Sequence, residues 1–139
     1  MKLIKKIFGG NKNLSEKENV KKEILSYLHD ESFQGARGIN PEINSNSYKV
    51  FVENLAPHVS EGLKGISQEE ITKIIDKISF ISSYDEDTCN EILGATLLLT
   101  TIVVTLRFTQ GVESSNSDIL KILQEIVNNL SLIHKKYYK

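Results

Sequence analysis

Acidic side chains gather in the segment 84–91, which reads YDEDTCNE. Asp85 and Asp87 have the spacing of the first two ligands of an EF-hand calcium loop. The third ligand position of such a loop is occupied by Cys89, and its glycine position by Asn90. Acidic residues just before a helix are also favoured by the helix macrodipole. The segment is therefore interpreted as a helix start and not as a metal site.

No other residues have the spacing of a catalytic or metal-binding motif. The three histidines are scattered along the chain, at His29, His58 and His134. Cys89 lies in the first turn of a predicted helix, but the neighbouring charges of Asp87 and Glu91 oppose formation of a thiolate. We therefore expect no catalytic residue, no metal ligand and no cofactor, and the chain is not predicted to be an enzyme.

The glycine pair in GARG, residues 35–38, could suggest a phosphate-binding loop. Such a loop needs a preceding strand or a lysine-bearing P-loop pattern, and the sequence has neither. Residues 34–47 are rich in Gly, Asn and Ser. We interpret GARG as a flexible turn and the whole stretch as a long loop.

Capping patterns and periodicity predict the elements that would position these residues. Three capping boxes indicate helix starts: Ser15 with Glu18, Ser67 with Glu70, and Thr88 with Glu91. The first helix should end near His29, and the second carries a stripe of isoleucines from Ile71 to Ile81. The last amphipathic helix should start at Ser117 and Asp118 and end in the basic sequence HKKYYK. Residues 48–63 suit either a helix or a short strand, and we favour a helix with Pro57 at a kink or at a new first turn.

The fifteen residues from Ile92 to Leu106 carry no charge. A bilayer span needs about 20 apolar residues, so this run, bounded by Glu91 and Arg107, is a poor fit to a membrane span. A buried strand would need neighbouring strands, and the sequence predicts none. We predict a central helix over 88–110 that ends before Gly111 and is buried on all sides, with its threonine hydroxyls bonded to the preceding turn.

Length and composition favour one ordinary globular domain. The chain has 139 residues, of which 40% are hydrophobic and 25% charged, and a single cysteine excludes an internal disulfide. We expect an all-α, single-domain bundle of about five helices over residues 14–139, preceded by a basic segment 1–13. No cleavage site follows the short apolar start, so a cytoplasmic location is expected.

Charge is distributed unevenly along the chain. Residues 1–25 carry a net charge of +4, residues 26–94 carry −7 and the remainder carries +2. An acidic middle disfavours nucleic acid as the main partner and permits a basic protein partner. A solvated surface without any partner explains the same pattern.

A well-formed core without a catalytic constellation favours a non-enzymatic module that binds and occludes another protein. The concrete form is a bacterial immunity protein or antitoxin that neutralises a basic toxin domain, possible toxins including nucleases. The expected contact residues are Tyr84, Asp85, Glu86 and Asp87, followed by Asp30 and Glu31. One alternative is a membrane-surface accessory protein that uses residues 1–8 and the basic tail, although this is not favoured. Another is an enzyme or ligand carrier with a pocket inside the bundle.

Overall fold

The computed structural model describes residues 12–63 and 84–137, together with positions 67, 69, 72–73, 76 and 81. In chain order the helices are α2 (Lys12–Ile39), α3 (Ser45–Leu63), α5 (Glu86–Thr109) and α6 (Asn116–Tyr137). The predicted all-α bundle is therefore confirmed. Glu70 of the capping box at Ser67, most of the isoleucine stripe and residues 1–11 lie outside the described residues.

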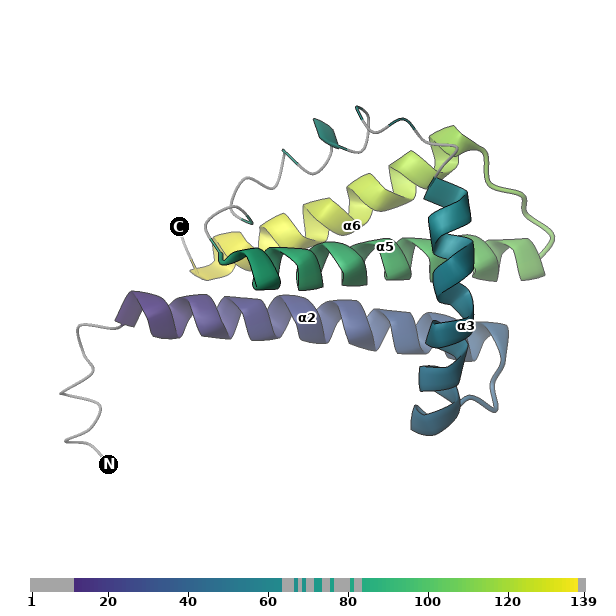
Figure 1. The fold of residues 1–139 in the computed structure, drawn as a ribbon, viewed down its shortest axis with the longest axis horizontal. Helices are drawn as coiled ribbons and strands as arrows, with labels where there is room; N and C mark the ends of the chain where they lie inside the picture. The colour runs from purple at the N-terminus through teal and green to yellow at the C-terminus, as the bar shows by residue number, and fades with distance from the viewer. Residues whose placement is uncertain are drawn as a thin grey trace.

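Three helices form the core layer, and the fourth crosses it (Figure 1). α2 and α5 lie side by side and run parallel, because Gly35 faces Ile102 and Gly38 faces Leu106. α6 runs antiparallel to both, and α3 crosses α2 and α5 at a steep angle (Figure 1). The shared core includes Val20, Ile24 and Leu28 of α2, Ile92, Ala95 and Leu99 of α5, and Leu123, Ile126, Val127 and Leu130 of α6.

α5 is the central helix that the uncharged run predicts. It starts at Glu86 and ends at Thr109, before Gly111 at φ 83°, a value that favours glycine. The prediction that this helix is buried on all sides is wrong. The buried residues face α2 and α6, whereas Gly94 and Phe108 on the opposite side are exposed. The sequence does not predict which side of α5 is exposed, because an almost uniformly apolar helix has no polar face.

The threonines of α5 donate to the carbonyls of the preceding turn, as predicted. Thr96 Oγ1 donates to the Ile92 carbonyl at 2.7 Å, and Thr100 Oγ1 donates to the Thr96 carbonyl at 2.9 Å. Thr101 and Thr105 form the same i−4 bond at 3.0 and 2.8 Å. The hydroxyl groups can therefore lie in an apolar helix without an unsatisfied hydrogen bond.

The predicted turn at GARG is wrong, because α2 continues through it to Ile39 and does not end near His29. A Cβ built on Gly35 would lie 2.7 Å from Ile102 Cγ2, and one on Gly38 would lie 3.1 Å from Leu106 Cδ1. The two glycines thus allow α2 and α5 to approach closely. Only residues 40–44 connect α2 to α3, so the predicted loop over 34–47 is also much shorter than expected.

The predicted helix starts also need correction. α2 begins at Lys12, three residues before the predicted cap Ser15. α5 is capped by Asp85, whose Oδ1 accepts the Thr88 amide at 2.7 Å. α6 begins two residues earlier than predicted, after Ser115, whose Oγ accepts the Asp118 amide at 3.2 Å while Asp118 Oδ2 accepts the Ser115 amide at 3.0 Å. The starts of α5 and α6 each contain more than one residue that can cap a helix, so the local sequence alone does not identify the cap.

α3 is a helix, as favoured, and it continues through Pro57 to Leu63, so Pro57 does not begin a new helix. It begins after Asn44, whose Oδ1 accepts the amides of Asn46 and Ser47, both at 3.0 Å. The Tyr48 ring packs edge-on against Phe33 of α2, with ring centroids 5.3 Å apart. Burial raises the pKa of Tyr48, and the neighbouring Ser32 hydroxyl offsets part of that rise. These contacts attach α3 to the C-terminal half of α2.

Candidate functional site

The acidic start of α5 is an ordered surface. Asp85 is the N-cap, and the hydrogen bond from the Thr88 amide is the largest cause of its lowered pKa, followed by the Thr88 hydroxyl and, more weakly, by Lys21. Glu86 and Asp87 occupy the first turn and are exposed. The cap thus keeps Asp85 ionised and fixes the backbone that presents Glu86 and Asp87 to solvent.

The other predicted contact residues are placed differently. Tyr84 is half-buried and packs against the shared core. Asp30 and Glu31 are exposed on α2. Lys21 is the α2 residue whose charge acts on Asp85, and Asp30 lies nine residues further along that helix, about 14 Å away at 1.5 Å per residue. The structure therefore does not join the two acidic groups into one continuous patch.

Cys89 lies behind the acidic turn with its thiol directed inward. Its Sγ donates to the Ile81 carbonyl at 2.6 Å and lies 3.7 Å from the Tyr84 carbonyl. Burial is the main cause that raises the pKa of the thiol, and the charges of Asp85 and Glu86 raise it further. The thiol is thereby held in its protonated form, which is the unreactive one.

His29 and His134, the histidines whose side chains the structure describes, belong to no cluster of candidate metal ligands. His29 is exposed on α2, and His134 is half-buried on α6, where burial lowers its pKa. The side chain of His58 lies outside the described residues. Within the described part of the chain, no group of three His, Cys, Asp or Glu side chains could hold a metal ion.

Two hollows in the described surface are large enough to receive a chemical group. One has a volume of about 380 Å³ and lies where α3 crosses the other helices, lined by His29, Tyr48, Lys49, Val52, Glu53 and Leu98. The other has a volume of about 350 Å³ and lies beside the turn from α5 to α6. Both are open to solvent, which differs from the enclosed pocket expected for a carrier with its ligand inside the bundle.

The turn from α5 to α6 carries exposed apolar side chains that the sequence reasoning missed. Phe108 is 65% exposed and Val112 is 49% exposed. The hollow beside them is lined by Val104, Thr105, Phe108, Glu113 and Ser114, and we call it the corner hollow. The available signal was the position of Phe108 just after the uncharged run and Arg107, four residues before a second apolar residue, Val112, in a polar loop.

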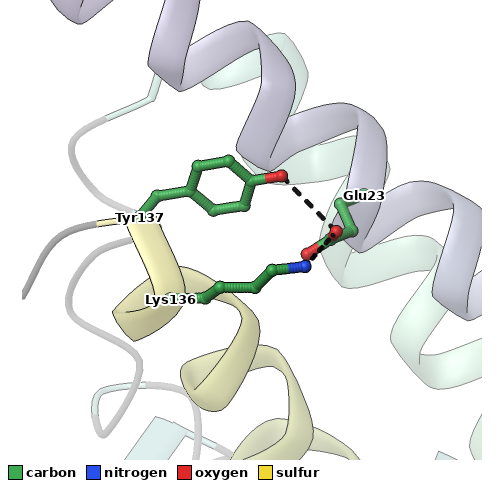
Figure 2. Close-up of polar contacts among 3 residues, drawn as sticks. All are labelled: Glu23, Lys136 and Tyr137. Atoms are coloured by element: carbon green, nitrogen blue, oxygen red, sulfur yellow. Dashed lines mark hydrogen bonds and ion pairs between the residues drawn. The ribbon is translucent and has the colours of Figure 1, made fainter.

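Polar contacts join the middle of α2 to the C-terminal half of α6 (Figure 2). Lys136 Nζ lies 2.9 Å from Glu23 Oε1, and the Tyr137 hydroxyl donates to the same oxygen at 3.4 Å. The Glu23 carboxylate raises the pKa of Lys136. Further along, Asn129 Nδ2 donates to the Tyr27 hydroxyl at 2.9 Å. These pairs are more than a hundred residues apart in the chain, and no local pattern predicts them.

Comparison of the chain with protein-family models, with curated proteins and with solved structures finds no match. By length and composition α5 could cross a membrane, a test that the core helix of a globular protein also passes.

Proposed function

We propose that the chain is a non-enzymatic protein-interaction module that inhibits a partner by occluding it. Its concrete form is a bacterial immunity protein or antitoxin that binds a basic toxin domain. The observation that carries the proposal is the capped acidic start of α5, where Glu86 and Asp87 are exposed on a fixed backbone. Preorganised charges of this kind attract an oppositely charged partner and lose little entropy on binding.

The position of these carboxylates also makes them compatible with a stable fold. The N-terminus of a helix is electropositive, so Glu86 and Asp87 stabilise α5 while they face solvent. Asp85 has a different role, because its carboxylate is engaged by the Thr88 amide. We therefore assign the contact with the partner to Glu86 and Asp87, and the positioning of the turn to Asp85.

The test is capture of a partner by the tagged chain from its own host, followed by direct binding and by an assay of the partner's toxicity or activity. The double variant Glu86→Lys with Asp87→Lys should weaken binding at least about tenfold, as expected when two charge pairs are lost and repulsion replaces them. Glu125→Lys, an exposed change on α6, is the matched control and should leave binding unchanged. The proposal would be contradicted by a stoichiometric partner that the unmodified chain and the double variant bind equally. A partner that keeps its full activity in the complex would also contradict it.

A membrane-surface role is a second candidate, and one observation favours it. The contact between Glu23 and Lys136 holds the last turn of α6 against α2 (Figures 1 and 2). The basic residues in the last turn of α6, Lys135 and Lys136, could act on anionic lipid from this position. Flotation with vesicles that contain anionic lipid, with and without residues 1–10, tests this role. If neither the full chain nor the chain without residues 1–10 is found in the lipid fraction, a membrane-surface role is excluded.

A further inference from the structure

The corner hollow lies on a turn with a fixed backbone. The Gly111 amide donates to the Phe108 carbonyl at 3.0 Å, and the Val112 amide donates to the Arg107 carbonyl at 2.9 Å. This pair of bonds is a Schellman motif, with Gly111 in the left-handed conformation that the motif requires. Ser115 and Asp118 then cap α6 on the other side of the turn. Phe108 and Val112 are therefore exposed on an ordered corner of the molecule.

The charges beside the hollow favour one kind of occupant. The amide and the hydroxyl of Ser115 are the main causes of the lowered pKa of Asp118, and the charges of Lys121 and Arg107 lower it further, so the positive charge of Arg107 reaches the start of α6. Glu113 lines the hollow, is exposed and forms no ion pair within the described residues. The Ser114 hydroxyl, also in the wall, has no hydrogen-bond partner among those residues. The rim is thus apolar and acidic, which complements an apolar side chain next to a basic one.

We propose that the corner hollow receives an apolar side chain of the partner protein, carried next to a lysine or arginine that pairs with Glu113. This inference rests on the proposed function, because it assigns a second contact to the same basic partner. The volume of about 350 Å³ lies at the small end of ligand pockets, which suits a single side chain. Aromatic residues, phenylalanine included, are enriched at protein interfaces relative to the rest of the surface.

The corner hollow and the acidic turn are separate surfaces. Glu86 and Phe108 lie at opposite ends of α5, 22 residues and about 33 Å apart. Their contributions can therefore be tested independently.

The probe is the dipeptide acetyl-Phe-Lys-amide, added to the isotope-labelled full chain while amide chemical shifts are recorded. We expect shifts at Val104, Thr105, Phe108 and Ser114, with acetyl-Phe-Glu-amide binding about three- to fivefold more weakly, the range of an exposed charge pair. Glu113→Lys should reverse that preference, and Phe108→Ser should abolish the shifts. Leu132→Ser is the matched control, because Leu132 is 63% exposed on α6 and does not line the hollow.

Several outcomes would overturn the inference. These are shifts that do not centre on the corner hollow, equal binding of the two dipeptides, or shifts that persist in Phe108→Ser. Concentration-dependent shifts of the same amides without peptide would assign the corner to a second copy of the chain, and shifts caused by lipid vesicles alone would assign it to a membrane. The Glu86→Lys, Asp87→Lys protein should still bind the dipeptide, so failure of the corner and failure of the acidic turn are distinguishable.

Discussion

Two glycines on neighbouring helices, Gly35 and Gly94, have opposite roles in stability. Gly35→Ala should destabilise the chain by about 1–2 kcal/mol, because the added Cβ would lie 2.7 Å from Ile102 Cγ2 and overpacking exceeds the gain in helix propensity. Gly94→Ala should stabilise it by about 1 kcal/mol, since a Cβ there meets no atom within 4 Å. Urea unfolding of both variants measures the free energies. Equal effects of the two changes would show that α2 and α5 do not approach closely at Gly35.

His134 makes stability depend on pH through its burial. Burial lowers its folded-state pKa below the ordinary value of 6.5, so the unfolded chain binds the proton more readily. The contribution of His134 is therefore complete above about pH 7, and it is lost as the pH falls through 6.5 toward the folded-state pKa. The lowered pKa values of Asp85 and Asp118 act at more acidic pH and do not overlap this window.

The free energy of urea unfolding should be measured between pH 8 and pH 5 for the chain and for His134→Gln. The difference in the free energy of unfolding between the chain and His134→Gln should shrink as the pH falls below 7 and become constant at lower pH. A difference that is constant over this range would show that the pKa of His134 is the same in the folded and unfolded states.

At the scale of the helix, the start of α6 distinguishes the sequence prediction from the structure. The sequence places the start at Ser117 and Asp118, whereas the structure places the cap at Ser115. Ser115→Ala should therefore cost about 1 kcal/mol, the usual effect of a lost N-cap, and Ser117→Ala inside the first turn should change stability by less than about 0.5 kcal/mol. Thermal unfolding of the two variants gives the comparison. A larger loss of stability in Ser117→Ala than in Ser115→Ala would show that Ser117 is the cap.

Periodicity and composition predicted which segments are helical, but not where α2 ends. The uncharged run predicted α5 closely, because a long apolar helix with a glycine stop has few alternative structures. The sequence GARG was misinterpreted because local propensity treats glycine as a helix breaker, while Gly35 and Gly38 are required by contact with α5. That requirement is a property of the packed pair of helices and is absent from the local pattern.

At the scale of the whole molecule, the candidate sites were only partly predictable. Charge alone identified the acidic turn, but only the structure separates Asp85 as a cap from Glu86 and Asp87 as exposed carboxylates. The corner hollow could not be predicted, because it depends on the direction in which the Phe108 side chain points from α5 and on the turn that connects α5 to α6. The pairing of Glu23 with Lys136 likewise depends on how α2 and α6 pack.

The layered arrangement predicts two levels of stability against local opening. α2, α5 and α6 share one buried core, while α3 lies across them and contributes few buried side chains within the described residues, notably Leu55. Pro57 also removes a backbone donor inside α3. Amides of α5 such as those of Leu99 and Ile102 should therefore exchange hydrogen only by global unfolding, with a free energy equal to that from urea, while amides of α3 exchange with a lower one.

The variant Tyr48→Ala tests the same arrangement. It removes the ring contact with Phe33, so it should speed hydrogen exchange in α3 while exchange in α5 keeps the free energy of global unfolding. Lys49→Ala, which changes an exposed neighbour in α3, is the control and should leave both helices unchanged. Equal protection of α3 and α5 in the unmodified chain would instead show that the crossing helix and the three-helix core unfold as one cooperative unit.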